Sequence, residues 1–373
     1  MHVLHLIKSL GLGGAENLLL STARRESPRG VRYSFGYFLP WKDALVGPLR
    51  ETGGEVTCFP ARSAAGILAR VPRVASHLRV GGVDLVHCHL PLAGVAGRLA
   101  GRWAGVPVVY TEHNVLERYH PLTRRANLWT WRLQRQVVAV SAEVAASIAR
   151  HAGDRVPVRV VTNGVPVERL RRDPDAAAEV RRRLGVASEA PLVGQVAVFR
   201  AQKRLDLWIE AARAIHERLP EARFALIGDG PLAGEVRQRV AAAGLAGVVH
   251  LPGLQEDVRP HLSALDVLMI SSDFEGLPLV VLEAMALEVP VVSTAVGGIP
   301  EAVVDGETGR LVPRGEAAAL ADAVVGLLAT SEEVRRRMGA AARRRVEASF
   351  GTARMLDELE DLYDRVLSGA GAV

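Results

Sequence analysis

Short apolar runs alternate with amphipathic segments along the chain, and this alternation predicts parallel strands joined by helices. In the first half, the predicted strands cover 2–7, 32–39, 55–59, 84–88, 107–111, 137–140 and 158–161. The predicted helices between these strands cover 15–25, 43–52, 64–80, 92–104, 122–136 and 141–151. We therefore expect an α/β domain with helices on both faces of a parallel sheet, and ligands beyond the carboxyl ends of its strands.

The alternation begins again after a polar segment at 168–175, which we interpret as an interdomain linker. The predicted strands of the second half cover 191–198, 222–228, 248–250, 266–270 and 290–293. The predicted helices there cover 203–218, 231–243, 255–263, 278–287 and 298–304. A chain of 373 residues exceeds the size at which a single core stops growing, so two doubly wound, Rossmann-like domains are the expected fold class.

Composition narrows the class of protein. Apolar residues make up 49% of the chain, but no apolar run is long enough to span a bilayer. The apolar start at 1–7 is too short for a signal-peptide core, so we interpret it as the first strand and expect a cytoplasmic protein. Cys58 and Cys88 are the only cysteines, which gives neither a disulfide framework nor a cysteine-based zinc site.

The net charge of +5 comes almost entirely from arginine, and it suits phosphate-bearing ligands or an anionic membrane surface. Arginine runs at 181–183, 335–337 and 343–345 lie in helical patterns with few aromatic residues. We interpret these runs as solvated helix faces and do not predict nucleic-acid binding.

Arginines interleave with tryptophans in the segment 118–136, an arrangement that can form a membrane-surface face. Leu122, Trp129 and Leu133 also form a stripe that could pack on the sheet. Packing is the favoured interpretation of this segment, and peripheral contact with an anionic membrane at the inner face of the cell membrane is the alternative.

One stretch carries the strongest candidate chemistry. The apolar run 265–270 predicts a buried strand, a polar loop follows as far as Gly276, and Pro278 suits the first turn of a helix. The N–H groups at such a helix start favour an anion such as a phosphate. Glu275 in the loop and Glu283 on the helix flank this anion site, and both can accept hydrogen bonds from sugar hydroxyls. On spacing alone, a helix-capping Glu275 and a solvated Glu283 explain the pattern equally well.

Two cations follow the first strand of the second half. Arg200 and Lys203 can reach one diphosphate together, the arginine through its planar fork and the lysine as a point charge. The alternative is a pair of surface cations at a helix start, which we disfavour because cations there oppose the helix dipole. We therefore predict a diphosphate site at this loop.

The first loop, at 8–16, is rich in glycine and opens a helix. It departs from the dinucleotide fingerprint because Glu16 stands where the third glycine belongs, and an anionic side chain there would repel a pyrophosphate. We interpret Gly13 and Gly14 as positions where the backbone comes close to another part of the protein, with a plain tight turn as the alternative.

Two features invite a metal and are discounted. His87 and His89 project to the same side of the fourth strand, but the sequence shows no third and fourth ligands. Asp173 and Asp175 form an Asp-x-Asp motif, but a helix predicted at 176–184 makes Asp175 a natural N-cap. We therefore expect no metal and no other cofactor.

The spacing of Glu275 and Glu283 resembles the Glu-x7-Glu signature of the retaining glycosyltransferases of family 4. In that family the first glutamate holds hydroxyls of the donor sugar and the second holds the ribose. The resemblance also implies donor-binding roles for the start of the helix, at Gly276, Leu279 and Val280. These roles are those of a sugar-nucleotide site.

Other motifs agree with this family in order and position. The run from Gly13 to Glu16 is similar to the family's first loop, where glycines approach the donor phosphate across a cleft. His113, at the carboxyl end of the fifth strand, matches a histidine that meets the hydroxymethyl region of the donor sugar. Gly253 to Asp257 matches a further donor-binding loop, which brings in Leu254 and Asp257. The resemblance covers almost the whole chain.

The resemblance implies the GT-B architecture, with two Rossmann-like domains. The acceptor-binding domain would cover 1–165 together with a final helix at 350–373, which crosses back onto it. The donor-binding domain would cover 166–349. The first domain would therefore be discontinuous in sequence.

The function expected is metal-independent, retaining transfer of a hexosyl unit from a UDP- or GDP-sugar to a saccharide, lipid-linked or small-molecule acceptor. Arg200, Lys203, Glu275 and His113 are the predicted catalytic residues. The nucleotide sugar, not a cofactor, is the molecule that the site would hold. Two alternatives stay open: a sugar-nucleotide epimerase or hydrolase of similar fold, and a non-catalytic nucleotide-sugar-binding scaffold.

Overall fold

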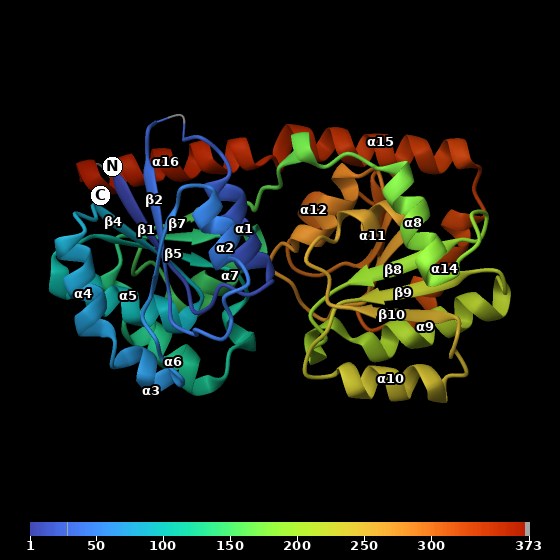
Figure 1. Cartoon of the computed structure of the whole chain (residues 1–373), viewed down its shortest axis with the longest axis horizontal. Coiled ribbons are helices and arrows are strands. Elements are labelled where there is room, and N and C mark those ends of the chain that lie inside the picture. Colours follow the sequence, from blue (N-terminus) through green and yellow to red (C-terminus); the bar gives the residue numbers. More distant parts are fainter. Residues whose placement is uncertain (28, 370–373) are drawn as a thin grey trace. The chain divides into compact units, whose positions relative to one another are not determined.

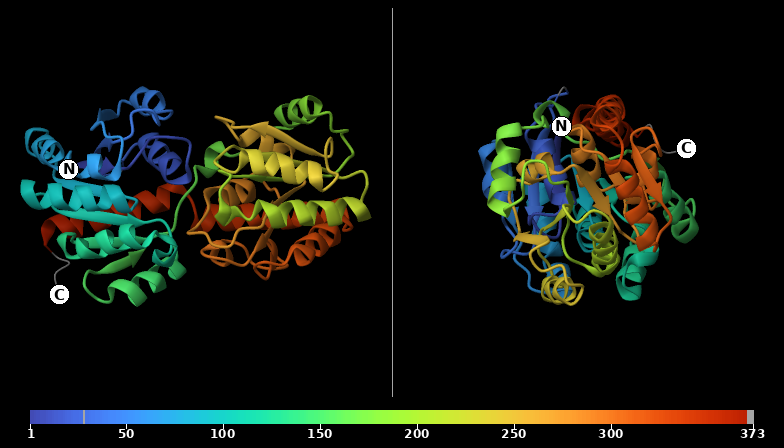
Figure 2. Two further views of the ribbon diagram at one scale, coloured as in Figure 1. Left: turned by 90° about the horizontal axis from the view of Figure 1, so that it is seen from below. Right: turned by 90° about the vertical axis from the view of Figure 1, so that its right-hand side faces the viewer.

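The computed structural model describes residues 1–27 and 29–369, which form two compact units (Figure 1). Unit 1 consists of Met1–Gly164 and the chain from Thr352 onward, and unit 2 is Val165–Gly351. Each unit contains a parallel sheet with helices on both faces (Figure 2). The predicted α/β fold class, with two doubly wound domains, is confirmed.

The sheet of unit 1 has the order β3-β2-β1-β4-β5-β6-β7 within the described residues, and every pair in it is parallel. Its strands are β1 (His2–Leu6), β2 (Arg32–Tyr37), β3 (Glu55–Cys58), β4 (Leu85–His89), β5 (Val108–Glu112), β6 (Gln136–Ala139) and β7 (Val158–Val160). The central strands β1, β4 and β5 are buried along their whole length, as strands covered on both faces must be.

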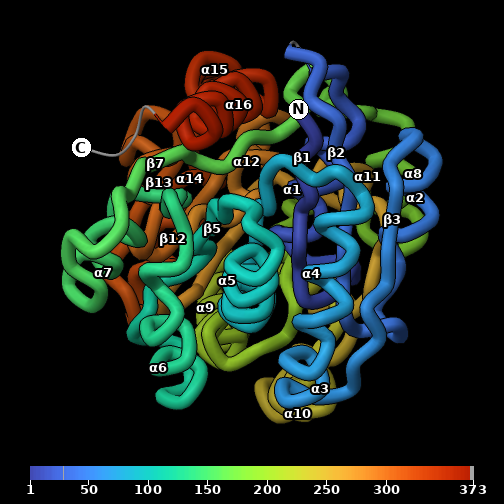
Figure 3. Tube along the Cα trace, turned by 90° about the vertical axis from the view of Figure 1, so that its left-hand side faces the viewer, coloured from blue at the N-terminus to red at the C-terminus, as the bar shows by residue number. Residues whose placement is uncertain are grey.

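The helices of unit 1 are α1 (Gly14–Ala23), α2 (Val46–Glu51), α3 (Ala64–Leu68), α4 (Val71–Val80), α5 (Pro91–Ala104), α6 (Pro121–Trp129), α7 (Ala142–Ala152) and α16 (Thr352–Ser368). Figure 3 shows α4, α5 and α6 side by side on one flank of the sheet. The final helix α16 packs against α1, burying Met355, Leu359 and Tyr363.

Two helices predicted for unit 1 are shorter than expected. The helix predicted at 64–80 divides into α3 and α4, because Pro72 lacks an N–H and suits only the first turn of a new helix. The helix predicted at 122–136 ends at Trp129, and a single 3₁₀ turn, Trp131–Leu133, follows. That turn places Trp131 in the core, at 0% exposed.

The stripe expected to pack on the sheet does not do so. Trp129 is 81% exposed, Leu122 is 68% exposed and Leu133 is 37% exposed. The packing interpretation of these residues is therefore wrong. The inward face of α6 carries Asn127 instead, whose amide oxygen accepts a hydrogen bond from the fully buried Arg98 of α5.

The sheet of unit 2 has the order β10-β9-β8-β11-β12-β13 within the described residues. Its strands are β8 (Leu192–Val196), β9 (Arg223–Ile227), β10 (Val249–Gly253), β11 (Val267–Ile270), β12 (Val291–Thr294) and β13 (Gly309–Val312). Its helices are α8 (Pro174–Leu184), α9 (Leu205–Arg218), α10 (Ala233–Ala242), α11 (Arg259–Ala264), α12 (Leu279–Ala286), α13 (Ile299–Ala302), α14 (Ala317–Leu328) and α15 (Glu332–Ser349). The edge strand β13 and the helices α14 and α15 were not assigned from the sequence.

The arginine runs are not simply solvated faces. Arg181 donates to the carbonyl oxygens of Ala190 and Ala264 and is ion-paired with Asp266, and only 13% of its side chain is exposed. Arg343 and Arg345 likewise donate to backbone carbonyls of neighbouring segments. These arginines satisfy orphan carbonyl groups at segment ends, so the solvated interpretation is wrong for them.

The Asp-x-Asp segment has a capping role, but with a different residue from the one expected. The side chain of Asp173, not Asp175, accepts a hydrogen bond from the N–H of Ala176 at the start of α8. Pro174 occupies the first helical position, so the cap lies one residue before it.

Among the described helices, none is long and apolar enough to cross a membrane.

Candidate functional site

The strand order of unit 2 reverses between β8 and β11. Ligands of doubly wound sheets bind at the carboxyl ends of the strands on either side of such a reversal. The loop 197–204 follows β8 and the loop 271–278 follows β11, so these two loops lie at the binding position. They carry four of the predicted site residues: Arg200, Lys203, Glu275 and Gly276.

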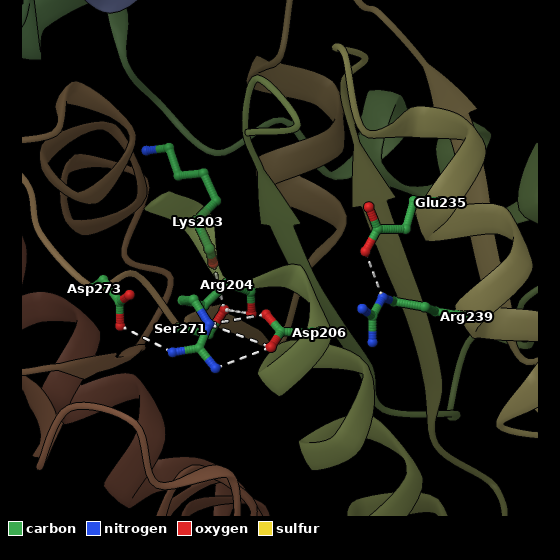
Figure 4. A network of polar contacts seen from close by, with 7 residues as sticks. All are labelled: Lys203, Arg204, Asp206, Glu235, Arg239, Ser271 and Asp273. Carbon is green, nitrogen blue, oxygen red and sulfur yellow. Dashed lines mark hydrogen bonds and ion pairs between the residues drawn. The ribbon is translucent and has the colours of Figure 1, made fainter. Parts of the chain in front are cut away.

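Hydrogen bonds and ion pairs join the two loops. The hydroxyl of Ser271 donates to the carbonyl oxygens of Lys203 and Arg204 at 2.8 and 3.0 Å, and the N–H of Asp273 donates to Gln202. The Arg204 guanidinium forms ion pairs with Asp206 and Asp273 at 2.9 and 3.2 Å (Figure 4). This network fixes the end of the first loop against the start of the second.

Lys203 and Glu275 form the central contact of the site. The Lys203 ammonium lies 2.6 Å from Glu275 Oε1, and the Ser272 hydroxyl donates to the same oxygen at 2.7 Å. The two side chains are only 15% and 7% exposed, respectively. Glu275 is therefore held by an ion pair and a hydroxyl, and α12 has no side-chain cap among the described residues.

Arg200 and Lys203 are in different environments. Arg200 is exposed in the loop after β8, whereas Lys203 ends a 3₁₀ turn and is mostly buried. The side chains of Lys203 and Arg204 point apart, so the Arg204 network does not use the lysine's ammonium (Figure 4). Whether Arg200 and Lys203 share a diphosphate stays a prediction.

Two glycines fix the loop that carries Arg200. A Cβ on Gly228 would lie 1.9 Å from the carbonyl oxygen of Ala197, and one on Gly230 would lie 2.6 Å from the nitrogen of Phe199. The Phe199 N–H donates to the Asp229 carbonyl at 2.9 Å. The Gly-Asp-Gly run after β9, weak as a motif, is therefore required for the close approach of these two backbones.

A third glycine fixes the loop that carries Glu275. Gly297 has a φ of +60°, and a Cβ there would lie 2.0 Å from the carbonyl oxygen of Glu275. The N–H of Gly298 donates to the Gly276 carbonyl, and the hydroxyl of Thr294 donates to the Ser272 carbonyl at 2.7 Å. Sequence reasoning missed Gly297, although the Gly-Gly pair shortly after β12 is a visible signal.

The helix α12 begins at Leu279. Pro278 occupies the N-cap position rather than the first turn predicted for it, with an extended backbone (φ −72°, ψ 125°). The first turn contains no acidic side chain. The N–H groups of Leu279 and Val280 have no carbonyl four residues back within the helix, so this end is suited to an anion.

Glu283 lies one turn further along α12 and is partly buried. Its removal from water raises its pKa to about 7, and the charge of Asp257 acts in the same direction. Glu283 is therefore not a fully solvated face residue. Asp257 follows the exposed Leu254 in the loop after β10 and forms an ion pair with Arg259 at 2.7 Å. The strand β10 ends at Gly253, whose φ is +79°.

In unit 1, the strand order reverses between β1 and β4. Gly13 is the N-cap residue of α1, and a Cβ on it would lie 2.3 Å from a carboxylate oxygen of Glu16. The Ser9 hydroxyl donates to the other carboxylate oxygen at 3.1 Å. Within the described residues, the group closest to Gly13 is therefore the Glu16 carboxylate. A Cβ on Gly14 would have no atom within 4 Å. An approach of these glycines to a donor phosphate stays a prediction.

Four histidines gather at the same reversal. The sequence offered no third partner for His87 and His89, but His5 of β1 pairs in register with His87, and the three can bring ligand atoms within 4.8 Å of one another. His113, which follows β5, lies 3.1 Å from His89 through its Nε2. These histidines lie close together because their strands are neighbours in the sheet. The sequence alone does not give this strand order.

Two parallel, doubly wound units with a candidate anion site at the strand reversal of unit 2 are the pattern of the GT-B glycosyltransferases. The Anabaena protein HepE, whose structure was solved in complex with UDP-glucose, superposes with a TM-score of 0.87 at 23% identity. The superposition covers 98% of this chain and 99% of HepE, which establishes the shared fold.

Family comparisons go further. Residues 12–169 match the family described as "Glycosyltransferase Family 4", and residues 190–330 match the family described as "Glycosyl transferases group 1". This chain belongs to the family 4 glycosyltransferases and is a glycosyltransferase. The resemblance inferred from the sequence motifs is confirmed at the level of the family.

Two relatives are similar over most of their length. The D-inositol 3-phosphate glycosyltransferase of Streptomyces coelicolor is 33% identical over 375 residues, which covers 90% of this chain and 79% of the relative. The 2-deoxystreptamine N-acetyl-D-glucosaminyltransferase of Streptomyces fradiae is 31% identical over 366 residues, which covers 91% of this chain and 85% of the relative.

Proposed function

We propose that this glycosyltransferase moves a hexosyl unit from a UDP- or GDP-sugar to a saccharide, lipid-linked or small-molecule acceptor, with retention and without a metal ion. Unit 2 binds the donor and unit 1 the acceptor in this proposal. The observation that carries it is the buried Lys203–Glu275 pair beside the uncapped start of α12. One group suits a phosphate and the other a sugar hydroxyl.

The chemistry follows from where charge develops. The bond from the anomeric carbon to the phosphate oxygen breaks, and the nucleoside diphosphate leaves with the bonding electrons. Arg200, Lys203 and the N–H groups of Leu279 and Val280 stabilise the charge that grows on this phosphate. The acceptor hydroxyl attacks the anomeric carbon from the same face, and its proton passes to the departing phosphate oxygen.

In this proposal Glu275 and Glu283 bind different parts of the donor. Glu275 accepts hydrogen bonds from hexose hydroxyls, and Glu283 accepts them from the ribose. Asp257, Leu254 and the loop at Gly276 complete the donor subsite, and His113 is the proposed contact of unit 1 with a sugar hydroxyl. The UDP-glucose named with HepE supports a UDP-hexose as the first donor to test. The names of the two Streptomyces relatives favour a small polyhydroxylated acceptor.

A donor screen tests the proposal. UDP- and GDP-sugars are added singly to the full chain, and the melting temperature is recorded, since a ligand that binds the folded state raises it by mass action. The stabilising donor is then incubated with candidate acceptors, products are detected by mass spectrometry, and their anomeric configuration is determined by proton NMR. A glycosylated acceptor with an unchanged anomeric configuration supports the proposal. Conversion of the donor without any acceptor product would indicate an epimerase or hydrolase, and binding without conversion a scaffold.

The exposed face of α6 supports a second, peripheral contact. Trp129 and Leu122 are largely exposed, and Arg124 and Arg125 lie on the same helix. Exposed apolar side chains next to arginines suit an anionic lipid surface, as at the inner face of the cell membrane. Sedimentation with vesicles containing phosphatidylglycerol tests this contact. Binding that is equal with neutral vesicles, or unaffected by the variant Trp129→Ser/Leu122→Ser, would exclude it.

A further inference from the structure

Three imidazoles form a hydrogen-bonded chain that leads into the core of unit 1. His113 Nε2 lies 3.1 Å from His89 Nδ1, and His89 Nε2 lies 2.9 Å from His5 Nδ1. His89 and His5 are 2% and 1% exposed, respectively. Every contact joins one ring nitrogen to another, so one ring of each pair must donate and the other must accept.

All three rings are neutral near pH 7. Removal from water lowers the pKa of His5 to about 3 and that of His113 to about 4, and it lowers the pKa of His89 well below its usual value. A neutral imidazole carries a single N–H. The direction of donation in one contact therefore fixes the direction in the other, and only two arrangements of the whole chain are allowed.

The inner end of the chain selects between these two arrangements. His5 Nε2 is buried and has no hydrogen-bond partner among the described residues. The cavity beside the ring is lined by aliphatic side chains such as Leu18 and Val138 and by the polar Thr22, Thr111 and Asn163, none of which hydrogen-bonds this nitrogen. If donation ran inward, His5 Nε2 would carry a buried N–H with no acceptor, which is rarer in proteins than an unused acceptor. Donation therefore runs outward, from His5 to His89 to His113.

We infer that His89 and His5 are positioning residues that hold His113 as its Nδ1–H tautomer, which makes it a neutral hydrogen-bond donor toward a substrate hydroxyl. His113 Nε2 is occupied as the acceptor from His89. Its Nδ1 has no hydrogen-bond partner in the described part of the chain. The tautomer assignment rests on the ring contacts together with the neutrality of the buried rings, and only the role toward a substrate rests on the proposed function.

A metal ion is the other occupant that this cluster suggests, because His5, His87 and His89 can bring ligand atoms together. The hydrogen bonds argue against it. His87 uses both ring nitrogens, toward Tyr363 and Thr111 at 2.5 and 2.6 Å, and His89 uses both of its own. Among the ring nitrogens of these three histidines, and within the described residues, His5 Nε2 alone is uncommitted, so a metal would have to displace several existing contacts.

Nitrogen-15 NMR of the histidine-labelled full chain tests the tautomer directly, with His113→Gln used to assign the signals. His113 is expected as the Nδ1–H form in the wild type. His89→Leu removes the donor and should shift His113 toward the Nε2–H form. His89→Gln keeps an amide N–H donor and should restore the Nδ1–H form. The control His250→Gln, on β10 of unit 2, should leave the His113 signals unchanged.

Kinetics gives the second measurement. His89→Leu should lower turnover about tenfold, roughly the worth of one hydrogen bond, and His89→Gln should recover most of it. UDP affinity should not change, because the nucleotide is proposed to bind unit 2. If His89→Leu does not fold, His5→Leu interrupts the same chain one ring deeper and is measured in the same way.

The outcomes separate the two proposals. An Nε2–H tautomer in the wild type, or an unchanged tautomer in His89→Leu, would overturn the relay. Stoichiometric Zn²⁺ binding that is lost in His5→Gln would also overturn it, and would assign the cluster to a metal. If the wild type turns over no sugar nucleotide, the proposed function fails while the NMR result still decides the relay.

Discussion

The ammonium of Lys203 and the carboxylate of Glu275 lie 2.6 Å apart, although 72 positions separate them in sequence. They come together because β8 and β11 are neighbours in the sheet, so the loops that follow these strands share one edge. The two charges compensate each other, although both side chains are mostly buried. A donor would exploit both, because the phosphate can take the lysine while a sugar hydroxyl takes the glutamate.

The two cations should differ in what their removal does to stability. Arg200→Ala and Lys203→Ala should each lower turnover by orders of magnitude, because each removes charge stabilisation felt most strongly in the transition state. Only Lys203→Ala should also lower the melting temperature, since it leaves Glu275 buried without a cation, at a cost of about 3 kcal/mol. Steady-state kinetics and thermal unfolding of both variants check this.

A double variant is the control for the pair. Lys203→Met combined with Glu275→Gln should recover the melting temperature lost in Lys203→Ala, because no unpaired charge remains, but it should stay inactive. If Lys203→Ala and Arg200→Ala keep near-normal turnover, the assignment of a diphosphate to this loop is wrong.

The two carboxylates should be separable by ligand. Glu283→Gln should weaken binding of both the free nucleoside diphosphate and the intact donor, because a ribose contact is made equally in the ground and transition states. Glu275→Gln should not weaken binding of the nucleoside diphosphate, which lacks the hexose and can pair with the freed Lys203 ammonium, and should instead depress turnover. Calorimetric titration of both variants with UDP decides between them. Equal losses would mean that the two acids are misassigned.

Chelation should have no effect on activity. The Lys203 ammonium, the Arg200 guanidinium and the start of α12 are proposed to fill the place that Mg²⁺ takes in metal-dependent transferases. Turnover measured with excess chelator should therefore equal turnover with Mg²⁺ or Mn²⁺ added. A loss of activity that either metal restores would return Asp173 and Asp175 to consideration, even though Asp173 caps α8.

Gly297 should be essential to the position of Glu275. Gly297→Ala introduces a Cβ 2.0 Å from the Glu275 carbonyl oxygen, in addition to the strain of an alanine at a φ of +60°. Gly306→Ala is the matched control, because its φ is +77° and no atom lies within 4 Å of the added Cβ. The control should lose about 1–2 kcal/mol of stability and no activity. Gly297→Ala should lose more stability and most turnover, and similar behaviour of the two variants would refute the argument.

Sequence patterns were sufficient for features that depend on neighbours along the chain. The buried run of β11, the loop to Gly276 and the helix α12 are local, and Pro278 was misplaced by only one position. Strand β13 was missed because Gly309–Val312 is a short edge strand without clear alternation, and a Cβ on Gly309 would meet the Val291 carbonyl. Gly309 is needed for the close packing of two strands, but in the sequence a glycine at this position resembles a turn signal.

Contacts between residues on different strands could not be predicted without knowing the strand order. Nothing near Glu275 in sequence indicates Lys203 or Gly297, and nothing near His89 indicates His5. The same holds for the arginines at 343 and 345, whose partners are backbone carbonyls that carry no sequence signal. Side-chain chemistry was therefore predictable residue by residue, while its pairing was not.

Glu283 should make nucleotide binding depend on pH near neutrality. Burial raises the pKa of its carboxyl to about 7 in the free protein. Ribose hydroxyls donate to the ionised form and favour it, so binding should lower this pKa and release a proton. The affinity for UDP should therefore rise as the pH rises toward about 7 and level off above it, falling roughly tenfold per pH unit on the acid side.

Calorimetry in buffers of different ionisation enthalpy measures the released proton directly. Glu283→Gln is the control, because it removes the titrating group while keeping the shape of the side chain. Any pH dependence that remains in this variant belongs to the phosphate of UDP and is subtracted. A wild-type profile identical to that of Glu283→Gln would show that Glu283 does not bind the ribose as an ionised acceptor.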